Sequence, residues 1–197
     1  MTSTAIVDSM RVVMVAPPPE FLDERRRRGL DRRDEVWDGV LHVPPQPTMF
    51  HQRLEGRLIE ILGPIARTRG LEVVPEPGYL DPQRGWDNYR VPDVIVVDPT
   101  HTTKRGVEGP AELVVEILSP GDESRDKFEF YAARGVKEIW LVEPETRALE
   151  LYVLRGTAYF AVVADRGVLR SEGLGLELQT IAGPKLRITW ADGDVEL

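Results

Sequence analysis

The spacing of hydrophobic and polar positions changes along the chain and predicts both helices and strands. Apolar residues recur at spacings of three and four between Leu54 and Ile65, which predicts an amphipathic helix over about residues 48–69. Two apolar, β-branched runs, 91–97 and 111–118, are typical of strands buried on both faces. These two runs and the helix before them predict the centre of the fold.

The remaining pattern predicts shorter elements on either side of this centre. Asp38-Gly39, flanked by alternating apolar residues, predicts a hairpin. Residues 75–90 are rich in proline and glycine and predict an extended connection with one further strand. Further strands are expected at 11–15, 71–74, 138–142, 147–154, 158–164, 167–177 and, as an edge strand, 185–190, and further helices at 20–28 and from the 119–122 turn to about 134.

This order of elements predicts an α/β or α+β architecture with a mixed sheet and one core. The length of 197 residues suits one full domain better than two. Residues 1–19 are expected to form an N-terminal arm, and residues 20–197 a single domain.

The composition excludes several classes of protein. The chain has no cysteine, which removes disulfides, thiolate metal sites and cysteine nucleophiles and suits a cytoplasmic protein. No apolar run approaches the roughly 20 residues of a membrane helix. The apolar stretch 10–16 lacks a basic leader, so no signal peptide is predicted.

The net charge of −8 does not favour binding to a polyanion, because phosphate contacts need lysine and arginine. Basic residues nevertheless gather at Arg25–Arg28, Arg32 and Arg33. Two interpretations stay open for this run, a solvated helix face and a local phosphate-binding patch.

Each of the two buried runs carries one acid, Asp93 at the start of the first and Glu116 inside the second. Asp93 follows a proline and could simply cap a turn, whereas a glutamate inside an apolar strand is usually paired or functional. Two carboxylates and a backbone carbonyl suffice for a hard cation such as Mg²⁺. The sequence therefore predicts a divalent-cation site, with the two carboxylates within about 5 Å of each other.

Three further residues acquire a chemical meaning only in combination with this pair. Lys127 taken alone is an exposed helix lysine, but Phe128 and Tyr131 beside it are expected to face the core. His51 is a helix cap, a surface residue or a substrate contact, and Glu35 taken alone is a surface acid. His42 and His101 receive no role.

Several segments together give the chain a family resemblance. They are DRRDEVWDGVLHVPPQPTMFHQRLEGRL, VPDVIVV and LVVEILSPGDESRDKFEFYAARGVKEIWLVEP, within about residues 20–180. The distinctive combination is Pro92-Asp93, Glu116 before Leu118-Ser119-Pro120, Asp126-Lys127 and the segment 135–144. In these features the chain resembles the Uma2 family, which is assigned to the restriction endonucleases of the PD-(D/E)XK superfamily.

The resemblance implies a restriction-endonuclease-like core, in which a helix, a mixed sheet and a second helix follow one another. Asp93 and Glu116 match the two acids of the motif. The chain departs from the simple motif at Leu118, where a lysine is expected, and Lys127 on the following helix takes that role. Glu35 matches a position where the family often has glutamate.

The resemblance also implies which residues of the site bind the metal, which are catalytic and which contact the substrate. Asp93, Glu116 and the backbone of Ile117 would bind Mg²⁺ or Mn²⁺, and Lys127 and Glu35 would complete the catalytic set. His51 and Ser119 would contact the substrate.

The function that follows is a metal-dependent endonuclease that hydrolyses phosphodiester bonds of nucleic acid, with DNA as the expected partner and a homodimer as the expected assembly. Two alternatives stay open: a non-catalytic module that binds nucleic acid or protein, and a hydrolase of a small phosphorylated compound. A basic rim around Asp93 and Glu116 would favour the nuclease, and an acidic or closed rim would favour the others.

Overall fold

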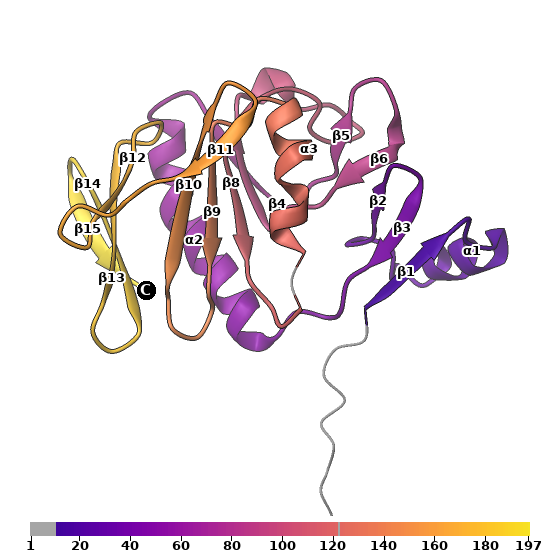
Figure 1. Cartoon of the computed structure of the whole chain (residues 1–197), viewed down its shortest axis with the longest axis horizontal. Helices are drawn as coiled ribbons and strands as arrows, with labels where there is room; N and C mark the ends of the chain where they lie inside the picture. Colours follow the sequence, from indigo (N-terminus) through magenta and orange to yellow (C-terminus); the bar gives the residue numbers. More distant parts are fainter. Residues whose placement is uncertain (1–10, 122) are drawn as a thin grey trace, which may run out of the picture.

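A mixed six-stranded sheet forms the centre of the molecule (Figure 1). The computed structural model describes residues 11–121 and 123–197. The strands of this sheet, in spatial order, are β11 (Ala158–Ala161), β10 (Leu149–Arg155), β9 (Glu138–Val142), β8 (Ala111–Ile117), β7 (Val94–Val97) and β4 (Glu72–Pro75). Only β8 and β9 run parallel. The predicted mixed sheet and the α+β class are confirmed.

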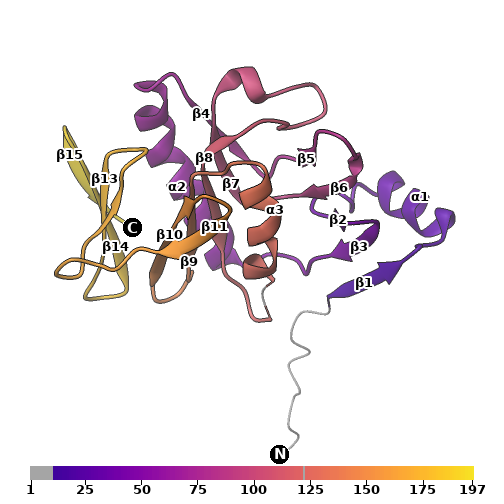
Figure 2. The same ribbon diagram turned by 45° about the horizontal axis from the view of Figure 1, so that its top comes forward.

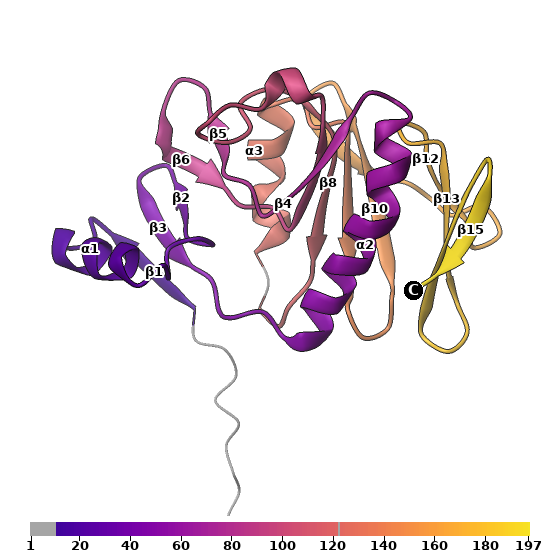
Figure 3. The same cartoon turned by 180° about the vertical axis from the view of Figure 1, so that it is seen from behind.

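Two helices cover the opposite faces of this sheet. Helix α3 (Phe128–Ala133) lies in front of the sheet in Figure 1, and α2 (Met49–Arg67) lies in front when the molecule is seen from behind in Figure 3. The Thr48 side chain accepts a hydrogen bond from the His51 amide and so caps α2. Pro64 lies inside α2 without ending it.

The alternation of side chains along β8 decides which residues meet which helix. Val115 and Ile117 pack into the apolar cluster that includes α2, and Val114 packs into the cluster that includes α3. Because successive side chains of a strand point to opposite faces, Glu116 lies on the α3 side of the sheet. The sequence therefore places this acid next to the helix that carries Tyr131.

A second sheet of five strands lies at one end of the molecule, together with α1 (Pro19–Arg27). Its strands, in spatial order, are β1 (Val12–Val15), β3 (Val40–Val43), β2 (Glu35–Trp37), β6 (Gly85–Arg90) and β5 (Tyr79–Asp81). The hairpin predicted at Asp38-Gly39 is confirmed, since both residues have positive φ, 51° and 89°.

A third sheet lies at the opposite end, as Figure 2 shows. Its strands, in spatial order, are β12 (Leu169–Ser171), β13 (Leu176–Ile181), β14 (Lys185–Trp190) and β15 (Gly193–Glu196). The buried Glu138 of β9 joins this sheet to the central one, because it accepts hydrogen bonds from Ser171 Oγ (2.6 Å) and the Gly173 amide (3.2 Å).

Several sequence-based boundaries were wrong. Residues 75–90 hold two strands, β5 and β6, because 82–84 form a tight turn between them. The expected strand 167–177 is two strands, interrupted by a turn in which Gly175 has φ of 62°. The expected edge strand 185–190 is internal, since β15 pairs with it.

The helix expected up to residue 134 is also shorter than predicted. It begins as a 3-10 turn, η2 (Ser124–Lys127), and becomes α-helical only in α3. A second 3-10 turn, η1 (Pro99–His101), lies in the expected loop 98–110. Residues 1–10 of the expected arm 1–19, and the turn position Asp122, lie outside the described residues.

Candidate metal and active site

Asp93 and Glu116 come from neighbouring antiparallel strands. In the pairing of β7 with β8, Val94 is opposite Val115. Asp93 directly precedes β7, and Glu116 directly follows Val115 in β8. Both acids are buried, at 4% and 3% exposure, and both line one cavity. The separation of the two carboxylates stays a prediction.

The Asp93 carboxylate is held by three groups. Its Oδ1 lies 2.7 Å from Nη2 of Arg33 and 3.2 Å from Nε2 of His51, and its Oδ2 accepts a hydrogen bond of 2.7 Å from the Ile117 amide. Burial acts to raise the pKa of Asp93, but the hydrogen bond and charge of His51, with Arg33 and the Ile117 amide, hold it below its usual value. Asp93 is therefore an anion at neutral pH.

The Glu116 carboxylate meets groups from the segment that follows its strand. Nζ of Lys127 lies 3.1 Å from Oε1 and 3.3 Å from Oε2, and the Tyr131 hydroxyl donates a hydrogen bond to Oε1. Burial raises the pKa of Glu116 to about 8; Lys127 opposes this, while the negative charges of Asp93 and Glu35 add to it. More negative charge is gathered here than Lys127 compensates.

Lys127 bridges two acids that lie far apart in the sequence. Its Nζ is 2.9 Å from Oε1 of Glu35 as well as 3.1 Å from Glu116. Burial acts to lower the pKa of Lys127, but the charges of Glu116 and Glu35 outweigh it and raise the pKa, so the ammonium stays protonated. Its place beside Glu116 is the one expected from the sequence, whereas its catalytic role stays a prediction.

Glu35 is a buried residue and is rigidly held. Its Oε1 accepts a hydrogen bond of 2.8 Å from the Val91 amide, and its Oε2 accepts one of 2.6 Å from Nε1 of Trp37. Strand β2, inside the five-stranded sheet, therefore presents this acid to the central sheet. The interpretation of Glu35 as an isolated surface acid was wrong.

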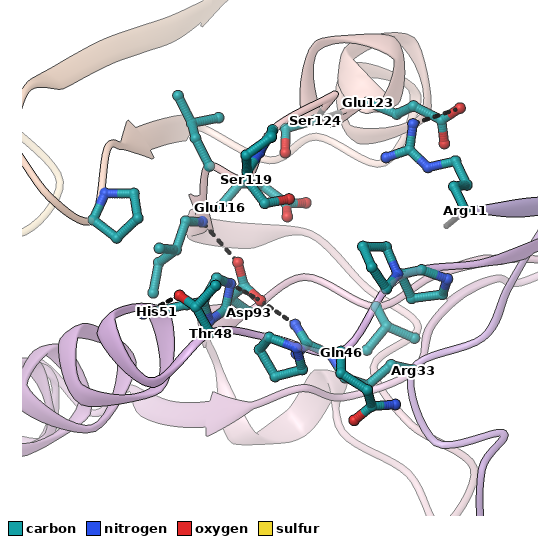
Figure 4. Close-up of a pocket in the computed structure, with 18 of the residues that line it drawn as sticks. Arg11, Arg33, Gln46, Thr48, His51, Asp93, Glu116, Ser119, Glu123 and Ser124 are labelled. Carbon is teal, nitrogen blue, oxygen red and sulfur yellow. Dashed lines mark hydrogen bonds and ion pairs between the residues drawn. The ribbon is translucent and has the colours of Figure 1, made fainter. Parts of the chain in front are cut away.

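His51 joins α2 to the site, as the close-up in Figure 4 shows. Its exposed fraction is 5%, so it is neither a surface residue nor the cap of the helix, which is Thr48. One turn along α2, Oε2 of Glu55 lies 4.0 Å from Nδ1 of His51. Single ligand atoms of His51, Glu55 and Asp93 lie within 4.8 Å of one another, a group that could hold a metal ion.

A cavity of about 580 Å³ is lined by Glu35, His51, Asp93, Glu116 and Lys127. Ile117 and Ser119 also line it, so all seven residues singled out in the sequence meet at this place. The wall has six acidic side chains and three basic ones among the described residues: Glu35, Asp93, Glu116, Glu123, Glu143 and Glu145 against Arg11, Arg33 and Lys127. The rim is thus not a basic one.

At one edge of the cavity, Arg11 just before β1 and His42 of β3 contact the segment before η2. The carboxylate of Glu123 lies 3.1 Å from Nη1 of Arg11 and 3.1 Å from Nδ1 of His42. The His42 ring stacks on Trp37 with centroids 4.1 Å apart. The charges of Arg11 and Glu123 therefore largely offset each other at this edge.

Three residues of the site were missed by the sequence analysis. Arg33 was counted in the basic run, Tyr131 was assigned to the core, and Glu55 was not considered. Helical spacing could have found two of them, because Tyr131 lies four residues after Lys127 and Glu55 four after His51. Arg33 reaches Asp93 across 60 positions, and no local pattern predicts such a contact.

Arg25–Arg28 of the basic run have acidic partners. Arg25 binds both oxygens of Asp34, and Arg26, Arg27 and Arg28 pair with acids on α1. Helix α1 has no buried residue. These contacts favour the solvated-face interpretation of Arg25–Arg28.

Comparisons with known proteins agree with this architecture. The profile of the Uma2 family, described as "Putative restriction endonuclease", matches residues 18–183. A solved structure from Anabaena variabilis ATCC 29413, described as "a putative nuclease belonging to DUF820", is similar with a TM-score of 0.57 and 15% identity over 72% of this chain and 82% of that one. The search among curated proteins finds no match.

The fold is therefore that of a nuclease-like α+β protein, and the chain belongs to the Uma2 family. The family resemblance expected from the sequence is confirmed. Among the helices of the described residues, none has the length and apolar character needed to cross a membrane.

Proposed function

We propose that this protein is a metal-dependent endonuclease that hydrolyses phosphodiester bonds of nucleic acid. The observation that carries the proposal is the convergence of Asp93, Glu116 and Lys127 on one cavity, in a chain of the Uma2 family. Two carboxylates can hold a metal ion that activates water, and a lysine can neutralise charge that develops on the phosphate.

The residues present suit a divalent cation. The donor atoms of Asp93 and Glu116 are hard oxygens, which Mg²⁺ and Mn²⁺ prefer, and the Ile117 carbonyl would be a third. Burial, together with the negative charges of Asp93 and Glu35, raises the pKa of Glu116, and a dication would stabilise its charged form. When bound, the ion would lower the pKa of a water molecule and stabilise charge on the phosphate.

The chain's own residues have distinct tasks in this proposal. The protonated Lys127 holds a water molecule for attack or neutralises charge that develops on the phosphate. Glu35 positions the ammonium from one side, and the Tyr131 hydroxyl restricts the rotation of the Glu116 carboxylate. Glu35 and Tyr131 are therefore positioning residues.

Two residues are assigned to the substrate. Ser119 lines the cavity just beyond the Glu116 strand, where its hydroxyl can contact a phosphate oxygen. His51 lines the same cavity and holds Asp93 through Nε2. Its contribution to substrate binding is therefore expected to act partly through Asp93.

The charge of the cavity wall favours a second candidate function. Six acids face three basic residues, and a duplex binds best to a wide basic surface. A non-catalytic module that keeps the fold, or a hydrolase of a small phosphorylated compound, needs no such surface. Under the nuclease proposal, bound dications offset part of this negative charge.

One assay separates these candidates. The full chain is incubated with plasmid, single-stranded oligonucleotide and a small phosphodiester, each with Mg²⁺ or Mn²⁺, beside an Asp93→Ala variant. Metal-dependent cleavage of nucleic acid that the variant lacks supports the endonuclease. Turnover of the small ester alone supports the small-molecule hydrolase, and no turnover of any substrate supports the non-catalytic module.

DNA as the substrate, a cytoplasmic location and a homodimer are further parts of the proposal. The edge strand β11 supports the dimer, because its Phe160 is 51% exposed and an uncovered edge can pair with another chain. A monomer mass in light scattering at micromolar concentration would contradict the dimer.

A further inference from the structure

His51 and Glu55 face each other on one side of α2 across a gap that no hydrogen bond spans. Nδ1 of His51 and Oε2 of Glu55 are 4.0 Å apart, beyond hydrogen-bond length. Nδ1 is buried, and among the described residues it has no hydrogen-bond partner. A buried polar nitrogen without a partner is costly, so this place requires an explanation.

The other nitrogen of the ring indicates how the proton is placed. The Asp93 carboxylate accepts hydrogen bonds from Arg33 and the Ile117 amide, so it has no hydrogen to give to His51. Nε2 of His51, at 3.2 Å from Oδ1, is then the donor of that contact. In the neutral ring, Nδ1 is left as a bare acceptor that faces a carboxylate, and two acceptors attract only through something positive between them.

We propose that His51 and Glu55 form a cation position of their own, with Asp93 beside it, that selects a transition-metal dication such as Zn²⁺ over Mg²⁺. Imidazole nitrogen is a good ligand for Zn²⁺, whereas Mg²⁺ takes oxygen ligands. Ligand bonds of about 2.0–2.2 Å place two tetrahedral donors roughly 3.3 Å apart. A small side-chain movement would bring Nδ1 of His51 and Oε2 of Glu55 from the observed 4.0 Å to that distance.

The arrangement around His51 has the support that metal-binding histidines need. A ligating histidine usually donates its second N–H to a carboxylate, which fixes the ring orientation. Asp93 does this here through Nε2. Asp93 would thus orient the His51 ring here and bind the ion of the Glu116 position; the inference rests on the proposed function only through this shared residue.

The test is a titration of the metal-free full chain with Zn²⁺, followed by ¹⁵N NMR of the histidine rings and by calorimetry. The expected result is a shift of the Nδ1 resonance of His51, while those of His42 and His101 stay in place. Glu55→Gln is expected to weaken this Zn²⁺ binding at least about tenfold, a loss typical of damaged metal sites. Glu60→Gln, an exposed acid on the same helix, is the matched control and should bind as the wild type does.

The outcomes separate this inference from the proposed function. Unmoved His51 resonances at saturating Zn²⁺, or Zn²⁺ binding in Glu55→Gln equal to that of Glu60→Gln, would overturn it. Glu116→Gln, which removes a ligand of the other position, should keep the His51 shift. If that variant keeps the shift while the wild type cleaves no nucleic acid, the cation position stands and the nuclease proposal fails.

Discussion

The Lys127 ammonium lies 3.1 Å from Oε1 of Glu116, eleven positions earlier in the chain. The same nitrogen is 2.9 Å from Glu35, on a different sheet. One lysine thus ties the five-stranded sheet to the central one and, in the proposed function, acts on the substrate as well. The simple nuclease motif has a lysine where this chain has Leu118. Lys127, on the element that follows β8, provides a positive charge in its place.

Replacing Lys127 should therefore affect both stability and cleavage. Alanine is a good helix former, but its propensity is the smaller effect here, because the change leaves the buried Glu35 without its counter-ion and Glu116 without the ammonium beside it. Breaking a buried pair in this way costs about 3–5 kcal/mol. Chemical unfolding of metal-free Lys127→Ala should show this loss, with Lys137→Ala, an exposed ion-paired lysine, near the wild type. Equal stability of the two variants would contradict the buried pairing.

The pH dependence of stability should carry the signature of Glu116. Burial raises its pKa to about 8 from 4.5, so the folded protein holds a proton that the unfolded chain releases at lower pH. The free energy of unfolding of the metal-free protein should fall as the pH rises between about 4.5 and 8. Glu116→Gln should flatten this fall, as measured by urea unfolding at a series of pH values. If the free energy of unfolding of Glu116→Gln falls with pH as steeply as that of the wild type, another titrating group causes the fall.

In the proposed metal site, Arg33 would compete with the ion for Asp93. Its Nη2 lies 2.7 Å from Oδ1, the same oxygen that contacts His51. Arg33→Gln removes this positive charge and should tighten Mn²⁺ binding several-fold in calorimetry, because like charges at short range repel. Arg32→Gln, an exposed neighbour, should leave the affinity unchanged. Weaker Mn²⁺ binding in Arg33→Gln would instead mean that the arginine helps to build the site.

The fold could be predicted from the sequence where the pattern was long and regular. Strands β7 and β8 were predicted from their continuous apolar runs. Helix α2 was predicted from apolar residues that recur every three or four positions. The strands on either side of Gly175 were harder to predict from the sequence. The alternation of apolar and polar residues continues through this region, but the positive φ of Gly175 belongs to a turn that separates two strands. The four-stranded sheet depends on the contact of Ser171 with Glu138, which is a tertiary interaction.

The site could be predicted in part for the same reason. Asp93 and Glu116 stand out because acids are rare in buried strands. Arg33 reaches this pair only through the approach of two separate sheets, so its pairing with Asp93 leaves no trace in local spacing. Glu35 was found through the family resemblance, since its hydrogen bond from the Val91 amide joins residues 56 positions apart.

The anchor of the four-stranded sheet should matter for stability alone. Ser171 is 1% exposed and donates its hydroxyl to the Glu138 carboxylate at 2.6 Å. Removing a hydrogen bond to a charged, buried group costs about 1.5–3 kcal/mol. Ser171→Ala should lose this much in urea unfolding while its metal binding stays that of the wild type. Metal affinity reduced in parallel with stability would mean that the two ends of the molecule are coupled.

The central claim is that the Asp93–Glu116 cavity hydrolyses nucleic acid, and the most direct test is the rate at which the full chain nicks supercoiled plasmid with Mg²⁺ or Mn²⁺. Wild-type protein and Glu145→Gln, an exposed acid on the cavity wall, should nick the plasmid at similar rates until a chelator is added. Glu116→Gln should be slower by at least about a hundredfold, because it removes a metal ligand and the partner of Lys127. Equal rates for Glu116→Gln and Glu145→Gln, or no nicking by the wild type with either metal, would contradict the claim.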